Sequence, residues 1–214
     1  RDIIASIRDR LLNIAKVEDI AFQRILTLYK QEGLLHRIVS TEYNDAVVLK
    51  GGLLFYQLQG LVARPTKDID LLGSYDAPEE IQLQDILEAA SKVEIEDGLM
   101  FDTNSILVEP ISGQTQHGGV RGHIICYLGK ARTRLQIDMG FGDIITGGPV
   151  QRPFRTLLVN RNFSIRTYSE ATVAAEKFVS GRIFGNHQQP LQGSLRSIRP
   201  SRLYRGSRGK HHRS

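Results

Sequence analysis

The sequence predicts an α/β fold (α+β in its detailed class) in which a mixed sheet is flanked by helices. Three observations indicate this. Residues 3–15 carry apolar side chains at helical spacing. Short apolar runs bounded by glycine and proline, which are typical of strands, begin near residue 46, and several of them follow one another in the middle of the chain. The 214 residues, 41% of them hydrophobic, suffice for one compact domain with small additions.

The local pattern justifies each element in chain order. Helical periodicity predicts two N-terminal helices, at 3–15 and 18–32, with Gly33 as the expected end of the second. A short strand at 46–49 leads through two glycines into a helix at 53–58, and Pro78 begins a helix that extends to about Ala90. The expected strands are 68–72, 105–109, 121–129, 133–139 and 157–159, and a last helix is expected from 169 to about 182.

Composition divides the chain into three parts, a helical segment at 1–40, a main domain at 41–185 and a tail at 186–214. The tail is rich in Arg, Ser, Gly, Gln and His without an apolar period, so we expect it to be disordered. Residues 187–214 hold seven basic and no acidic side chains, whereas the rest holds 21 basic and 23 acidic ones. The net charge of +5 is therefore no evidence for a nucleic-acid-binding surface on the main domain.

Composition also excludes several classes of protein. No apolar run reaches about 18 residues, so no membrane span is expected. The N-terminus lacks a signal-peptide pattern, and the single Cys126 excludes an internal disulfide framework and a cysteine-based zinc site. These features predict a cytoplasmic protein.

The most informative residues are Asp68 and Asp70. Residues two apart on a strand point to the same face, so the two carboxylates project together while Ile69 enters the core. Like charges side by side repel, and a divalent cation removes the repulsion. Two solvated aspartates on a surface strand or turn are the alternative, because Asp-x-Asp is common by chance. Taken with the neighbouring motifs, the pair indicates a catalytic magnesium site.

Asp138 is the predicted third carboxylate, near the end of another apolar run. Aspartate is disfavoured in strands, so one placed there is either functional or exposed on an edge. Asp143 competes for this role, although the glycines around it indicate a loop. Three carboxylates on adjacent strands can hold two Mg²⁺ ions. One ion would lower the pKa of an attacking hydroxyl, and the other would neutralise a triphosphate and the leaving pyrophosphate.

Glycines and basic residues near these carboxylates are candidate nucleotide ligands. Gly51 and Gly52 lie where a strand meets a helix, so their backbone can approach a phosphate, although a lone Gly-Gly is more often an ordinary tight turn. Lys177, on the last predicted helix, can pair with a triphosphate or simply extend to water. Further candidates for phosphate contact, with solvated charges as the alternative, are Lys50, Arg64 and Lys67.

These motifs resemble the AbiEii/AbiGii toxin family of nucleotidyltransferases. The similarity extends over about residues 3–185 and is carried by six runs. The runs are RLLNIA at 10–15, VVLKGGLL at 47–54, RPTKDIDLLG at 64–73, LQID at 135–138 with GFGD at 140–143, YSE at 168–170 and AEK at 175–177.

The resemblance implies a polymerase-β-like nucleotidyltransferase fold and transfer of a nucleoside monophosphate from an NTP to an acceptor hydroxyl. It implies that Asp68 and Asp70 are metal ligands, Asp138 the third carboxylate and Lys177 the triphosphate-binding lysine. Members of the family are toxins of type IV toxin–antitoxin systems, some of them in abortive phage infection, so a cognate antitoxin is an expected partner. Related toxins modify the 3′ end of tRNA, which makes RNA one candidate acceptor.

The sequence departs from the family after the predicted lysine helix. The family continues with a segment resembling Asn-Ser-Arg-Tyr-Lys-Asp-Leu-Tyr-Asp-Leu, which carries a functional aspartate and precedes further helices. Allowed codons for Gln188 to Pro200, read one base later, can spell this segment. We hypothesise a frameshift near residue 186, and codons that do not give the motif in the shifted frame would reject it. Two other interpretations stay open: a truncated, inactive homologue that only binds a partner, and a nucleic-acid-binding protein that acts through its basic tail.

Overall fold

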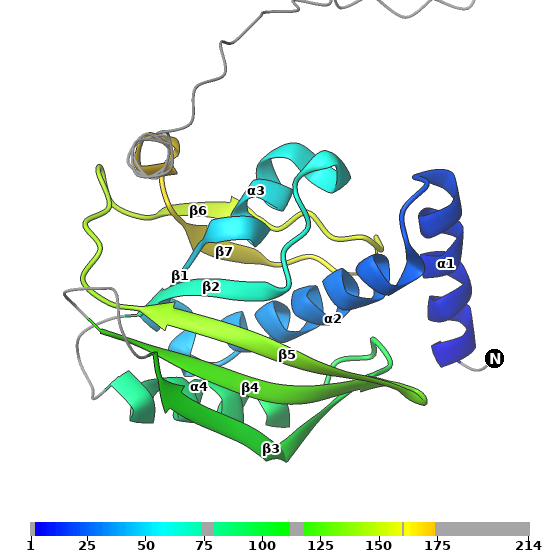
Figure 1. The fold of residues 1–214 in the computed structure, drawn as a ribbon, viewed down its shortest axis with the longest axis horizontal. Helices are drawn as coiled ribbons and strands as arrows, with labels where there is room; N and C mark the ends of the chain where they lie inside the picture. The colour runs from blue at the N-terminus through cyan, green and yellow to red at the C-terminus, as the bar shows by residue number, and fades with distance from the viewer. Residues whose placement is uncertain (1–2, 74–78, 112–117, 160, 174–214) are drawn as a thin grey trace, which may run out of the picture.

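The computed structural model describes residues 3–73, 79–111, 118–159 and 161–173, and a seven-stranded mixed sheet lies at its centre (Figure 1). The strand order is β3-β4-β5-β2-β1-β7-β6; β2 pairs with β5 and β1 with β7 in parallel, and the other pairs are antiparallel. The strands are β1 (Val47–Lys50), β2 (Asp68–Gly73), β3 (Leu99–Pro110), β4 (Gly119–Leu128), β5 (Ala131–Gly140), β6 (Val150–Pro153) and β7 (Ser164–Thr167). The helices are α1 (Ile3–Val17), α2 (Phe22–Val39), α3 (Gly51–Gln59) and α4 (Glu79–Lys92), with short 3₁₀ turns at Glu42–Ala46 and Gly60–Val62. The predicted α/β fold is confirmed.

Helices α2 and α4 cover one face of the sheet (Figure 1). Leu83 and Leu87 of α4 pack so closely over Gly122 of β4 that a Cβ at Gly122 would lie 2.9 Å from each side chain. Burial alternates along β4 and β5, and the core side chains include Leu135 and Ile137. In the part of the chain that the structure describes, the opposite face of β3–β4–β5 carries no helix, so alternate side chains of these strands face outward.

The second helix is longer than predicted. Gly33 does not end α2, which continues to Val39 and buries Leu34, Leu35 and Ile38. A Cβ at Gly33 would lie 2.2 Å from the Leu99 side chain, so glycine here permits close packing between the helix and the start of β3. The apolar side chains after Gly33 supply enough buried surface to outweigh its weak helix propensity.

The prediction of a strand at 157–159 is wrong, and strands β6 and β7 were not predicted. The backbone N–H of Leu157 donates to the buried Glu32 carboxylate at 3.0 Å instead of to a neighbouring strand. Thr156 donates to the carbonyl oxygens of Leu158 and Arg161, which holds the segment as a tight loop. These interactions with distant or irregular partners replace a strand ladder.

A buried ionic cluster connects α2 to the loops before β3 and β7. Asp97 accepts hydrogen bonds from Arg37 at 2.7 and 3.0 Å, from Arg161 at 2.9 Å and from the backbone N–H of Leu99 at 3.0 Å. The guanidinium of Arg161 also stacks over the Tyr29 ring at 3.9 Å. All of these charged side chains are almost fully removed from water. A second acidic side chain, Glu32, lies 3.8 Å from Arg161, so the two guanidinium groups face two acids, and buried charges need such partners.

Several predictions fall on residues that the structure does not describe. The last predicted helix begins at Glu170 and is described only to Val173. Lys177 and the tail at 186–214 lie outside the described residues. Among the helices of the described residues, none has the length and apolar character needed to cross a membrane.

Candidate active site

Asp68, Asp70 and Asp138 come together on the outward face of the sheet. Asp68 and Asp70 occupy alternate positions of β2, and the parallel register places Asp70 directly beside Asp138 and Asp68 beside Gln136 of β5. Neighbouring strands lie about 4.8 Å apart, so residues in register are adjacent on one face. The face is the one opposite α4, because the intervening residues Ile69 and Ile137 are fully buried.

The environment of Asp70 disfavours its charged form. Burial raises the pKa of the Asp70 carboxyl, and the Asp138 and Asp68 carboxylates raise it further. Against these effects, the backbone N–H of Gly52 donates to Asp70 Oδ2 at 3.3 Å. Burial and the neighbouring Asp138 also raise the pKa of Asp68. The charged forms of Asp68 and Asp70 are therefore disfavoured, first by burial and then by neighbouring carboxylates, and a bound cation would favour them.

Asp138 is held by an arginine of the neighbouring strand. Arg121 lies in register with Asp138 on β4 and donates from Nε to Oδ1 at 2.8 Å and from Nη2 to Oδ2 at 2.7 Å. The amide of Gln136 donates to the same carboxylate at 3.2 and 3.3 Å. Both oxygens of Asp138 are thus occupied by donors of the protein itself.

The carboxylates of Asp68, Asp70 and Asp138 are suitable ligands for a divalent cation, but in this structure they are not arranged around a single ion position. Carboxylate oxygens are the ligands that Mg²⁺ prefers, and the pair on β2 has excess negative charge. Within the described ranges, however, no three His, Cys, Asp or Glu side chains lie close enough to hold one ion. The carboxylate of Asp138 instead holds Arg121, so a site for a shared ion requires this carboxylate to be released.

The two glycines shape the turn from β1 into α3. Gly51 has φ +63°, and a Cβ there would lie 2.0 Å from Asp70 Oδ2, so only glycine allows this carboxylate to approach the backbone. A Cβ at Gly52 would lie 2.4 Å from Thr66, which precedes β2. The turn therefore positions Asp70, and the Gly52 amide is directed to this carboxylate.

Lys50 and Asp143 form a separate pair at the edge of the carboxylate face. Lys50 is in register with Asp70, and its Nζ lies 2.6 Å from Asp143 Oδ2. The hydroxyl of Tyr168 donates to the same oxygen of Asp143. Asp143, the competing third carboxylate, thus lies in the loop after β5 with its own cation, whereas Asp138 stands beside Asp70.

The remaining predicted ligands lie around the start of β2. Arg64 is exposed and lines a small hollow together with Gly52 and Thr66. Lys67 is also exposed, and its positive charge lowers the pKa of the adjacent Asp68 carboxyl. Arg64 thus shares a hollow with Gly52, while Lys177 lies outside the described residues.

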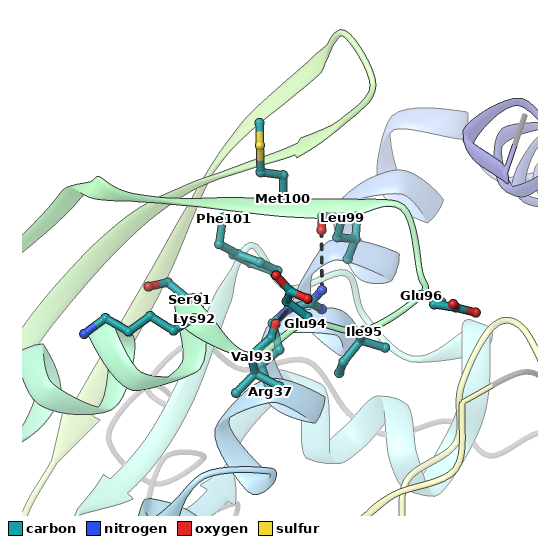
Figure 2. A pocket seen from close by; sticks show the side chains of 10 residues that line it. All are labelled: Arg37, Ser91, Lys92, Val93, Glu94, Ile95, Glu96, Leu99, Met100 and Phe101. Atoms are coloured by element: carbon teal, nitrogen blue, oxygen red, sulfur yellow. Dashed lines mark hydrogen bonds between the residues drawn. The ribbon is translucent and has the colours of Figure 1, made fainter.

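A larger hollow than the one beside Arg64 lies elsewhere, between the end of α4 and the start of β3 (Figure 2). Its floor includes Arg37, whose donors are taken up by Asp97 and by the carbonyl oxygens of Val93 and Leu99. Its other polar lining residues, Ser91, Lys92, Glu94 and Glu96, form no in-register group of carboxylates like that of Asp68, Asp70 and Asp138. We therefore place the candidate active site at the carboxylates of β2 and β5 instead.

Arg121 and Tyr168 are the residues near the site that sequence reasoning missed. Arg121 begins a predicted strand, and a basic residue near the start of a strand is by itself unremarkable in the sequence. Only the β4–β5 register brings it to Asp138. The turn at Gly129 and Lys130 sets that register, whereas the predicted strands at 121–129 and 133–139 put the turn at 130–132 and so did not pair Arg121 with Asp138.

Comparisons with known proteins were made for sequence and for fold. A family model described as "Nucleotidyl transferase AbiEii toxin, Type IV TA system" matches residues 33–187. Two solved structures from Helicobacter pylori are similar in fold. One is JHP933, with 15% identity and a TM-score of 0.46 over 79% of this chain. The other is described as a "putative nucleotidyltransferase" and has 14% identity and a TM-score of 0.44 over 74% of this chain. The chain matches 61% and 59% of the length of those two proteins. The comparison with curated proteins gave no significant match.

Proposed function

Because this chain belongs to the AbiEii nucleotidyltransferase toxin family of type IV toxin–antitoxin systems, we propose that it transfers a nucleoside monophosphate from an NTP to an acceptor hydroxyl. In this reaction the acceptor oxygen bonds to the α-phosphorus, the bond to the β-phosphate oxygen breaks, pyrophosphate leaves and the hydroxyl proton passes to water. The single observation that carries the proposal is the adjacency of Asp68, Asp70 and Asp138 on one exposed face of the sheet.

The residues of the chain have distinct roles in this proposal. Asp68 and Asp70 hold two Mg²⁺ ions, with Asp138 as the third ligand once Arg121 releases it. Bound there, Mg²⁺ would lower the pKa of the acceptor hydroxyl and neutralise the triphosphate. Gly51 and Gly52 keep Asp70 in place, and exposed Arg64 and Lys67 orient the phosphates. We assign Lys177 to the triphosphate on the family resemblance alone.

The reaction is tested by supplying the purified chain with each α-labelled NTP, Mg²⁺ and total RNA. We expect one NTP to label RNA and to release pyrophosphate, and we expect EDTA to stop both. Labelling that persists without a divalent cation would contradict the proposed chemistry. Absence of labelling with any NTP, together with binding of a cognate antitoxin, would show the inactive homologue, as a frameshift near residue 186 would produce.

We propose that the acceptor is RNA and that it approaches along β5. Arg132 and Arg134 are exposed at alternate positions of β5, on the same face as Gln136 and Asp138. From Arg132 to Asp138 the strand extends for about 20 Å. This row carries basic side chains along a path that ends at the carboxylates, as a single strand with its 3′ hydroxyl at Asp138 would need.

Replacing both Arg132 and Arg134 with alanine is expected to raise the KM for RNA roughly 10-fold or more while leaving the KM for NTP unchanged. The reason is that each contact with a phosphate adds electrostatic affinity for the polynucleotide but none for the nucleotide. The variant with Arg8 and Lys16 of α1 replaced serves as a charge-matched control, because these exposed residues lie on another element. Deletion of 187–214 tests the basic tail: loss of RNA binding only in this deletion would assign the acceptor to the tail.

A further inference from the structure

The guanidinium of Arg121 binds the Asp138 carboxylate, which the proposed function assigns to a magnesium ion. This guanidinium contacts both oxygens of Asp138 at 2.8 and 2.7 Å, next to the two carboxylates of β2. A bidentate arginine is the strongest common partner of a carboxylate in a protein. While this contact is made, Asp138 has no oxygen free of donors to offer to an ion.

The setting indicates that the contact can be broken. The side chain of Arg121 is 37% exposed and that of Asp138 21% exposed, in contrast to the fully buried Arg37–Asp97 pair of the core. In a partly exposed pair, water can solvate both charges when they separate, so breaking it costs less than breaking a buried pair. Arginine is also long enough to swing its fork through water, and the fork matches the oxygens of a phosphate as well as those of a carboxylate.

The groups around Asp138 make exchange of its cation favourable. Asp68 and Asp70 add negative charge, and only Gln136 shares Asp138 with Arg121 among the hydrogen-bond donors described. His123 and Lys67 act on Asp68, but their charges do not replace the two direct bonds of Arg121. A triphosphate arriving at this face would offer Arg121 another anion at the moment when a metal ion accompanies it.

We propose that Arg121 is a positioning residue that couples metal binding to nucleotide binding. In the nucleotide-free protein it holds Asp138 and disfavours the cation; when the triphosphate binds, it moves to a phosphate and releases Asp138 to the metal. This inference rests on the proposed function and adds the order of events. Its consequence is a site that binds metal weakly until the substrate is present, with a coupling of about 10-fold.

The test measures Mn²⁺ affinity of the full chain by electron paramagnetic resonance, with and without a non-hydrolysable NTP analogue. In the wild type, the analogue is expected to raise Mn²⁺ affinity about 10-fold. Arg121→Gln is expected to bind Mn²⁺ about 10-fold more tightly without the analogue, and to gain little when it is added. Arg121→Lys keeps the charge but not the fork, so its affinity is expected to be intermediate.

Arg134→Gln is the charge-matched control, since it removes one positive charge from the same face four positions before Asp138. Equal Mn²⁺ affinities of Arg121→Gln and Arg134→Gln would overturn the proposal, because the effect would then be one of net charge. The proposal would also be overturned if the Mn²⁺ affinity of the wild type did not change when the analogue is added. Thermal melting supplies a second measurement: a merely structural arginine would lower the melting temperature equally with and without Mn²⁺, whereas we expect Mn²⁺ to raise it more in Arg121→Gln than in the wild type.

Asp70→Asn separates failure of this inference from failure of the proposed function. If Mn²⁺ binding depends on Asp70 but not on Arg121, only the coupling is wrong. If Mn²⁺ binds equally well to Asp70→Asn and to the wild type, the ion does not occupy the carboxylates of β2. The proposed function then fails as well.

Discussion

Asp70→Asn is expected to abolish nucleotide transfer and, at the same time, to make the metal-free protein more stable. The activity falls because the amide offers one neutral oxygen in place of a charged carboxylate at the centre of the site. Loss of several kcal/mol of transition-state stabilisation by the metal corresponds to a decrease in kcat of roughly 10³-fold or more. Incorporation of α-labelled NTP into RNA measures this decrease.

The gain in stability has a different origin. In the folded protein, burial and two neighbouring carboxylates raise the pKa of Asp70 above its ordinary value. A raised pKa means that the folded state binds the proton more tightly than the unfolded state, so the contribution of Asp70 to stability decreases as pH rises from the ordinary pKa through the raised one. At neutral pH the wild type retains the full electrostatic cost of the ionised group, and Asp70→Asn removes it.

Thermal melting in EDTA tests this expectation. The melting temperature of Asp70→Asn should exceed that of the wild type at pH 7, and the difference should shrink as the pH falls through the raised pKa of Asp70, where the wild-type carboxyl gains its proton. Asp9→Asn, at an exposed position of α1, serves as the control and should change neither property. An Asp70→Asn protein that is active, or one that melts below the wild type at neutral pH, would contradict the picture of a strained, metal-binding carboxylate.

The sequence predicted the carboxylate positions well because they depend on short-range rules. Alternation along a strand puts Asp68 and Asp70 on one face whatever the rest of the fold does, and an aspartate in an apolar run distinguishes Asp138. The contact between Arg121 and Asp138 depends instead on which strands are neighbours and in which register. The turn eight residues after Arg121 sets this register, so the pairing of Arg121 with Asp138 became known only from the structure.

The fold shows the same contrast between features that local sequence determines and features that long-range contacts determine. Helical periodicity correctly predicted α1 and the first part of α2, but the rule that glycine ends a helix failed at Gly33, where close packing against Leu99 decides. The short strands β6 and β7 show no clear alternation of apolar and polar residues in the sequence, and the residues that pair between them are more than ten positions apart. At 157–159 an apolar pattern suggested a strand, yet the distant Glu32 takes the backbone N–H that a strand would use. Long-range partners override local preference in each case.

Asp97→Ala is expected to destabilise the fold by about 3–5 kcal/mol. Asp97 is fully buried and pairs with two guanidinium groups, those of Arg37 and Arg161. Its removal leaves the buried Arg37 guanidinium without its carboxylate partner, leaves Arg161 with Glu32 at 3.8 Å, and leaves the backbone N–H of Leu99 without its acceptor. Figure 2 shows how Arg37 lies between the end of α4 and the start of β3, so the loss would loosen the outer strands of the sheet.

Urea unfolding measures the expected change, which corresponds to a decrease of roughly 6–20 °C in melting temperature for a protein of this size. Glu170→Ala is the matched control: Glu170 pairs with Arg152 at 3.1 Å, but its side chain is 73% exposed, so removing it should cost at most about 1 kcal/mol. Comparable losses of stability in the two variants would show that burial does not determine how much the Asp97 cluster contributes to the free energy of unfolding. A large loss at Asp97 alone would instead mean that the fold beneath the carboxylate face depends on this buried ionic cluster, about which the sequence motifs of the family carry no information.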